Sequence, residues 1–147
     1  MKKIFIILTL TLLVQCGYKP IYTNENTNFK ISNIEINNKN KIIETRLKSL
    51  GNKNPEFYYD LKINISETKS TLSKNKKGDP TLFRMLISLD VQVFENDDLV
   101  MEKKYFSNFD YQNLDKKFEL NQYEDQIRKD IFNAISTEIF LDLTELK

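Results

Sequence analysis

Two stretches of strictly alternating side chains limit what this chain can fold into. Residues 57–65 and residues 83–93 carry an apolar side chain at every odd position, with mostly polar side chains between them. Successive side chains of a β-strand point to opposite faces, so each stretch predicts a strand with one buried face. Such strands need a second layer, because an amphipathic sheet buries its apolar face against another element.

The segments around these two strands predict the rest of a sheet. The polar stretch Glu67–Pro80 separates them and is expected to form a long exposed hairpin loop. Glu95–Asp98 predicts a tight turn, after which residues 99–109 pair back as the third strand of an antiparallel meander. Residues 29–36 also alternate but change phase at Ser32–Asn33, which predicts a further strand with a bulge.

Apolar residues at helical spacing predict two amphipathic helices. The first covers residues 40–50 and ends before Gly51, where a helix often has glycine. The second covers residues 117–141, and Glu124 and Arg128 are expected to form an i, i+4 ion pair on its outer side. Its predicted buried face consists of Leu120, Tyr123, Ile127, Ile131 and Ala134, extended by Ile135 and Ile139. The order strand, helix, three strands, helix therefore predicts an α+β fold, a two-layer sandwich in which two helices cover a four-stranded, mainly antiparallel sheet.

The composition excludes most kinds of enzyme chemistry. The chain of 147 residues has no histidine and one cysteine, so imidazole catalysis, a thiolate zinc cage and an intramolecular disulfide are ruled out. No motif indicates catalytic residues, a metal site or a cofactor, and a hydrolase that uses carboxylates alone is the one catalytic alternative. The 22 basic and 21 acidic side chains nearly cancel, which argues against a nucleic-acid partner.

The N-terminus has the pattern of a secretory signal. Lys2 and Lys3 precede the apolar run Ile4–Val14, and polar residues follow from Gln15 onward. A helix that spans a membrane needs about 20 apolar residues, whereas a signal peptide needs about 7–15. The apolar run is therefore predicted to direct export rather than to anchor the chain permanently.

The single cysteine lies at the end of this signal. The tetrapeptide Leu13–Cys16 resembles a bacterial lipobox, although Gln15 stands where Gly, Ala or Ser is usual. Lipidation of Cys16 would anchor the chain stably, since each buried methylene contributes about 0.8 kcal/mol. Gly17, rather than Asp, after the cysteine resembles the pattern of outer-membrane sorting, and a soluble periplasmic protein with an incidental cysteine is the alternative. The predicted organisation is a signal peptide at 1–15, a lipidated N-terminus and tether at 16–28, and a single domain at 29–147.

Basic residues in the predicted hairpin loop form one candidate binding site. The loop carries Lys69, Lys74, Lys76 and Lys77. Arg84 follows the loop and is expected to project from the less covered face of the sheet, near the same end. These cations would suit phosphate or carboxylate groups. A solvated hairpin tip and a cross-strand ion pair of Arg84 are the simpler alternatives.

Aromatic residues in the last predicted strand form a second candidate site. Tyr105, Phe106, Phe109 and Tyr111 carry more apolar surface than one strand face is expected to bury. Tyrosine and phenylalanine are enriched in the cores of protein interfaces, so part of this cluster is expected to meet a partner protein. Packing under the C-terminal helix is the competing interpretation.

Several segments, in a fixed order along the chain, together carry a family resemblance. The most specific is Cys16–Tyr22 (CGYKPIY), which matches a C-G-[FY]-[RK]-P-[LI]-Y signature. The others are Ile43–Leu50 (IETRLKSL) with Gly51, Tyr58–Ser66 (YYDLKINIS), Arg84–Phe94 (RMLISLDVQVF), Tyr105–Tyr111 (YFSNFDY) and Asn121–Asp125 (NQYED). Together they resemble the LPS-assembly lipoprotein LptE family, especially its alphaproteobacterial forms, and the resemblance covers nearly the whole chain.

This resemblance implies a function and two partners. Such proteins are lipid-anchored in the outer membrane, facing the periplasm. They plug the LptD β-barrel, support its assembly, and bind lipopolysaccharide during its insertion into the outer leaflet. The resemblance implies lipid phosphates as ligands of Lys69, Lys74, Lys76, Lys77 and Arg84. An auxiliary lipoprotein of another outer-membrane lipid-transport system, linked to an ABC transporter, is the alternative function.

Overall fold

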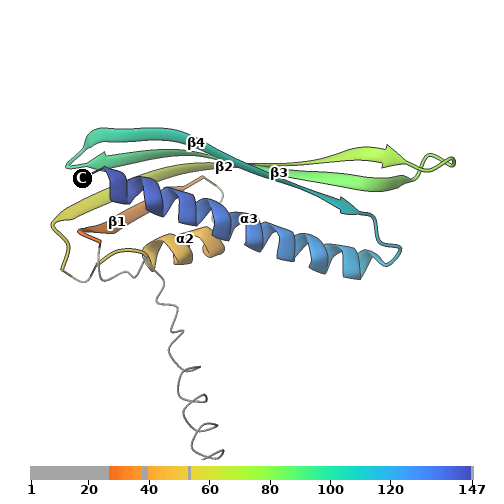
Figure 1. Ribbon diagram of the computed structural model, residues 1–147, viewed down its shortest axis with the longest axis horizontal. Helices are drawn as coiled ribbons and strands as arrows, with labels where there is room; N and C mark the ends of the chain where they lie inside the picture. The colour runs from red at the N-terminus through yellow and green to blue at the C-terminus, as the bar shows by residue number, and fades with distance from the viewer. Residues whose placement is uncertain (1–26, 38–39, 53, 147) are drawn as a thin grey trace, which may run out of the picture.

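The computed structural model describes residues 27–37, 40–52 and 54–146. The predicted signal peptide, Cys16 and the tether up to residue 26 lie outside the described residues. Figure 1 shows a long sheet with both helices on the same side of it, as the alternating strands require. The predicted α+β fold and its element order are therefore confirmed.

The sheet has four strands in the order in which they occur in the chain. They are β1 (Phe29–Ile36), β2 (Phe57–Lys74), β3 (Pro80–Glu95) and β4 (Asp98–Gln112), with β1 parallel to β2 and the other pairs antiparallel. The register of β1 against β2 shifts between Ile31 and Asn33, which is the predicted bulge. The shift keeps Ile34 and Ile36 opposite Leu61 and Ile63, so β1 continues to contribute to the same apolar layer.

The prediction of a loop at Glu67–Pro80 is wrong for most of that segment. β2 continues to Lys74, and β3 begins at Pro80, so that only residues 75–79 form the turn. Both faces of β2 are exposed beyond Ser66. This part of the strand therefore needs no apolar alternation, because pairing with β3 satisfies its backbone groups while its polar side chains face water. The result is a hairpin arm at one end of the molecule (Figure 1).

The predicted turn between β3 and β4 is confirmed. Asn96 and Asp97 both have positive φ, at 50° and 70°. Two successive residues with positive φ match the twist of the flanking strands in a two-residue hairpin, and Asn and Asp tolerate this conformation best after glycine.

The first helix is short and closes one end of the core. Helix α2 (Lys41–Lys48) begins where the Asn40 side chain accepts a hydrogen bond from the Ile42 backbone N–H at 3.0 Å. It buries Ile43 and Leu47 completely. Gly51 then pairs with Lys30 of β1, and its φ of +122° requires a glycine.

Helix α3 (Lys117–Glu145) runs obliquely along the whole layer (Figure 1). Its buried side chains begin with Leu120, Ile127 and Ile131 and continue with Ile135, Ile139 and Leu143. The predicted face is therefore wrong at two positions, because Tyr123 and Ala134 are exposed. The buried stripe turns around the helix because the helix crosses the strands obliquely and its C-terminal half also packs on α2.

The core lies between the sheet and the two helices. The odd-numbered apolar residues of β2 and β3 are buried in it, as the alternation predicts. The other face of the sheet is not covered by either helix (Figure 1). No helix in the described part of the chain is both long enough and apolar enough to cross a membrane.

Candidate functional site

The tip of the hairpin arm is a rigid turn that carries three lysines. The Asn75 side-chain oxygen accepts hydrogen bonds from the backbone N–H groups of Lys77 at 2.9 Å and Asp79 at 3.0 Å. Gly78 has a φ of +91°, and its N–H donates to the Asn75 carbonyl at 3.0 Å. Lys74, Lys76 and Lys77 are exposed there, and none of them forms an ion pair with another described residue. The tip therefore presents three positive charges on a fixed backbone.

Lys69 belongs to a different environment from the three tip lysines. Its ammonium lies 2.5 Å from a carboxylate oxygen of Glu124 and 4.1 Å from the centroid of the Phe83 ring. The lysine charge is thus neutralised by the carboxylate and covered on one side by the aromatic face. Lys69 connects the arm to α3 instead of pointing to solvent with the tip.

Glu124 is the centre of this connection, and its position corrects the prediction of an outward ion pair. The residue is only 6% exposed, and it also accepts a hydrogen bond from the Tyr111 hydroxyl at 2.8 Å. Burial raises the pKa of Glu124, but the hydrogen bonds from Lys69 and Tyr111 outweigh it, so the net pKa lies below its ordinary value. Burial and the same hydrogen bond raise the pKa of Tyr111. The carboxylate therefore holds β2, β4 and α3 together in its charged form.

Arg128 extends the connection along the helix. Its guanidinium donates to both carboxylate oxygens of Glu67 on β2, at 2.9 and 3.0 Å, and to Asp125 at 2.8 Å. The nearest oxygen of Glu124 is 3.8 Å away, so the predicted i, i+4 pair exists but is the weaker of its contacts. Arg128 thereby fixes the N-terminal half of α3 against the root of the arm.

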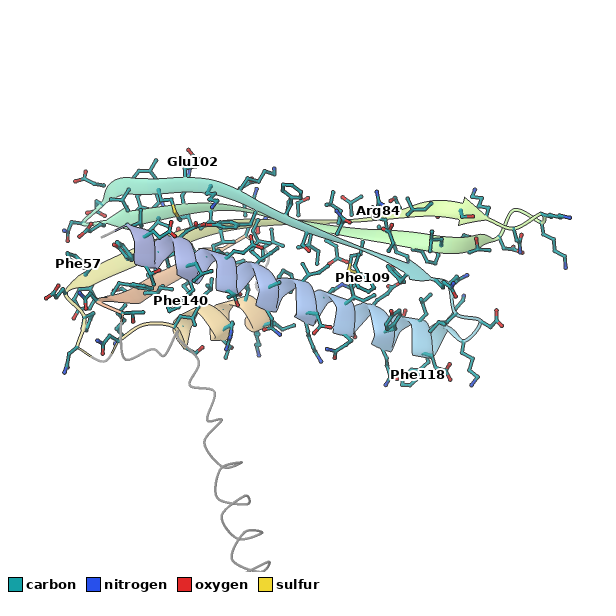
Figure 2. All side chains as sticks on the ribbon, in the orientation of Figure 1. Phe57, Arg84, Glu102, Phe109, Phe118 and Phe140 are labelled. Atoms are coloured by element: carbon teal, nitrogen blue, oxygen red, sulfur yellow. The ribbon has the colours of Figure 1, made fainter. Side chains whose placement is uncertain are left out.

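Arg84 lies on the uncovered face of the sheet, as predicted, but its guanidinium is already paired with a carboxylate. Its Nε and Nη2 donate to the two carboxylate oxygens of Asp110 on β4, at 2.6 and 2.7 Å. The hydrogen bond to this carboxylate raises the pKa of Arg84 and lowers that of Asp110. Figure 2 shows Arg84 on the side of the sheet away from α3. The structure therefore does not bring Arg84 together with the tip lysines as free cations.

The predicted aromatic cluster is divided between two environments. Tyr105 and Tyr111 are buried beneath α3, so for them the packing interpretation is correct. Phe106 follows the buried Tyr105 in β4, so its side chain points to the uncovered face, where it is 67% exposed. Phe109 is 44% exposed and lies beside α3 (Figure 2). Of the four aromatic side chains in the cluster, only these two offer apolar surface to a partner.

A second tyrosine–carboxylate contact holds the other end of α3. The Tyr105 hydroxyl donates to Asp142, which also pairs with Lys103 at 2.7 Å. Burial raises the pKa of Asp142, whereas the hydrogen bonds from Lys103 and Tyr105 lower it. The hydrogen bonds have the larger effect, so the net pKa lies below its ordinary value. Neither the role of Asp142 nor the burial of Glu124 was predicted from the sequence. For Glu124 a signal existed, since it follows Leu120 by four residues and precedes Ile127 by three, on the buried face.

An open groove of about 900 Å³ lies between the root of the tip and the start of α3. Its lining mixes Asp79, Asp115 and Lys117 with apolar Leu82 and Leu120. In the described ranges, no three His, Cys, Asp or Glu side chains gather closely enough to hold a metal ion. The groove is thus a largely polar surface next to the basic tip, and its described side chains do not include the cluster of carboxylates that a metal ion needs.

Comparison with solved structures identifies proteins of the same architecture. Rare lipoprotein B from Shewanella oneidensis aligns with a TM-score of 0.58 and 13% identity, over 78% of this chain and 95% of its own. A minor lipoprotein from Acinetobacter baumannii aligns with a TM-score of 0.63 and 17% identity, over 81% and 93% of the two chains. Lipoprotein B from Nitrosomonas europaea gives 0.62 and 15%, over 87% and 90%. Neither family models nor curated protein sequences match this chain.

These similarities define the fold of the chain and no more. It has the α+β fold that these three bacterial lipoproteins share. At 13–17% identity the side chains of a site do not carry over, so the chemistry of this chain rests on its own residues.

Proposed function

We propose that this protein is a lipoprotein of the outer membrane, anchored through Cys16 and facing the periplasm, that binds lipopolysaccharide and supports an LptD-like β-barrel. Its fold supports this proposal, because the solved proteins of the same architecture are lipoproteins. The N-terminal signature and lipobox point to the same class. The observation that carries ligand binding is the group of three unpaired lysines on the rigid tip of the arm.

The tip is suited to the phosphate groups of a lipid. Lys74, Lys76 and Lys77 lie within four residues of one another, on a turn whose backbone is held by Asn75 and Gly78. Lysine ammonium groups on flexible stems can meet phosphates at several positions, as point charges. The fixed backbone reduces the ordering cost of binding. Lys69 and Arg84 act differently in this proposal, because they stabilise the arm through Glu124 and Asp110.

The uncovered face of the sheet suits a polar barrel wall. Its charges are largely paired across strands, as in Arg84 with Asp110 and Lys104 with Asp90 at 3.1 Å. Gln92 likewise donates to Glu102 at 2.9 Å. Paired charges lose less hydration energy on contact than isolated ones do. We propose that this face, with Phe106 exposed on its edge strand β4, contacts the barrel.

Charge reversal at the tip tests ligand binding. We expect Lys74→Glu, Lys76→Glu and Lys77→Glu together to weaken binding of purified lipopolysaccharide at least about tenfold, and the remaining affinity to vary less with salt. The matched control is the triple reversal of Lys30, Lys41 and Lys129, which are exposed and unpaired with other described residues elsewhere on the surface. Equal affinity of the two triple variants would show that the tip does not bind the lipid.

Affinity purification from detergent-solubilised outer membranes tests the partner. We expect a large β-barrel to co-purify with the tagged full chain, and Phe106→Glu to reduce its yield. An inner-membrane ABC transporter in place of the barrel would support the alternative lipid-transport function. Mass spectrometry of the mature N-terminus tests the acylation of Cys16.

A further inference from the structure

The two edges of the sheet are not equivalent. At the β1 edge, Asn52 N–H donates to the Phe29 carbonyl at 2.9 Å, and Gly51 pairs with Lys30. The loop after α2 therefore covers the first residues of that edge. At the β4 edge, no backbone hydrogen bond between described residues reaches the outer side of the strand. An open edge of this kind is a template for an added strand.

The register shows which backbone groups of β4 face outward. Asn113 N–H donates to the directly opposite Thr81 carbonyl at 2.9 Å, in the same register as the β3–β4 pairs. Hydrogen-bonded and non-bonded pairs alternate in an antiparallel ladder, so odd-numbered residues of β4 bond to β3. The even-numbered residues consequently direct their N–H and C=O groups away from the sheet, and these include Phe106, Asn108 and Asp110. These groups lie in one row along the edge.

An apolar groove lies beside this row of backbone groups, between β4 and α3. A hollow of about 260 Å³ has walls formed by Phe109, Tyr123, Ile127, Ile131 and Ala134. A second hollow of about 490 Å³ continues past Tyr123 to Leu114. Figure 2 shows Phe109 between the strand and the helix. An extended segment on the edge would place every second side chain over this groove.

The charge at the groove indicates the chemistry of the segment. Asp130 lies in the wall of the first hollow and accepts a hydrogen bond from Gln126 at 2.9 Å. It has no cationic partner among the described residues. A basic side chain on the incoming segment would complement this carboxylate.

We propose that the β4 edge binds an extended segment of a partner protein by strand addition. About six residues of the segment pair with Phe106, Asn108 and Asp110, and they place apolar side chains in the groove and a basic one near Asp130. This surface is distinct from the lysine tip, and it borders the uncovered face, because the side chains of the even-numbered β4 residues, Phe106 among them, point to that face. A test of strand addition at this edge is therefore independent of the test of lipopolysaccharide binding at the tip.

A designed peptide tests the proposal on the purified full chain. The probe is a fluorescein-labelled eight-residue peptide that alternates threonine with valine, phenylalanine, lysine and valine, titrated to about 1 mM by fluorescence anisotropy. We expect it to bind, and amide hydrogen exchange to slow at Phe106, Asn108 and Asp110, whose N–H groups are free. Absence of binding over this range would overturn the proposal.

Substitutions on the edge separate strand addition from general adhesion. Asn108→Pro removes one outward N–H without touching the bonds to β3, and should weaken peptide binding about tenfold. Asn108→Ala keeps the N–H and should change binding less than about twofold. Asp130→Lys should reverse the preference for the lysine peptide over one with glutamate in its place. Circular dichroism confirms that the variants are folded.

Two results would contradict the proposal directly. Asn108→Pro with wild-type affinity would show that the peptide binds without backbone pairing. Protection of the three outward amides in the free protein, lost at Phe106 and Asp110 in Asn108→Pro, would show that this chain or a second copy already occupies the edge. Sedimentation of the wild type and Asn108→Pro then distinguishes those two occupants.

Discussion

Removal of the Glu124 carboxylate tests whether it holds the arm and α3 together. In Glu124→Leu, an apolar side chain of similar length replaces a buried acceptor that binds two donors, Lys69 and Tyr111. The Tyr111 hydroxyl is then left buried without its partner, since the residue is only 3% exposed. Lys69 is less affected, because its side chain is 38% exposed and can turn to water.

The expected magnitude follows from these exposures. An unsatisfied buried hydroxyl costs about 1–3 kcal/mol. The lost ion pair adds at most about 1 kcal/mol, because solvent screens the lysine. We expect Glu124→Leu to lower the free energy of unfolding by about 2–3 kcal/mol in total. At about 4 °C per kcal/mol for a domain of this size, the Tm should fall by roughly 8–12 °C.

A double-mutant cycle with Tyr111→Phe isolates the contact. The double variant has no hydroxyl to leave unsatisfied, so it should be more stable than the sum of the single effects predicts, by about 1–2 kcal/mol. Urea unfolding gives the free energy of unfolding of all four proteins, which are the wild type, the two single variants and the double variant. The matched control pairs Tyr111→Phe with Asp142→Leu, in the second tyrosine–carboxylate contact. Asp142 is 18 residues further along α3, about 27 Å away, so these two effects should add.

The cycle can refute the reasoning. If Tyr111→Phe and Glu124→Leu add within about 0.5 kcal/mol, the two side chains are not coupled in the folded protein. The carboxylate would then contribute through Lys69 and Arg128 alone. Equal coupling in the control pair would instead indicate a global change in α3.

Three further predictions concern the fold. Gly51→Ala should lower the free energy of unfolding in urea by about 2 kcal/mol, because φ is +122° and a Cβ atom would lie 2.9 Å from the Phe29 carbonyl oxygen. The neighbouring substitution Asn52→Ala is the control and should lower this free energy less. Met85→Ala should cost about 2–5 kcal/mol, since Met85 is fully buried, and a loss below about 1 kcal/mol would show that the core collapses into the gap. Burial raises the pKa values of Tyr105 and Tyr111 above the ordinary 10.0, so stability is complete below pH 10 and falls above it, where only the unfolded chain ionises. Unfolding measured at increasing alkaline pH should show a shallower loss in the double phenylalanine variant, and an unchanged slope would contradict this explanation.

Local periodicity was sufficient for the architecture of this protein. The alternation in residues 57–65 and 83–93, the phase change at Ser32–Asn33 and the turn at Glu95–Asp98 all predicted what the structure contains. These signals are reliable because a strand or a turn is decided by residues a few positions apart, through side-chain direction and backbone conformation. The apolar layer followed from them.

Polar positions needed the tertiary structure. Lys69 and the tip lysines look alike in sequence, yet Lys69 alone meets a buried carboxylate, which lies 55 residues further along the chain. The strand in residues 67–74 was missed for a related reason, since its stability comes from pairing with β3 and not from its own polar side chains.

The oblique path of α3 explains the remaining differences. It exposes Tyr123 and buries Glu124, although the two are neighbours in the chain. Which lysines stay free, which carboxylates are buried and which edge stays open depend on contacts between distant segments. Periodicity places a side chain on a face, but only the packing of helix on sheet decides what that face meets.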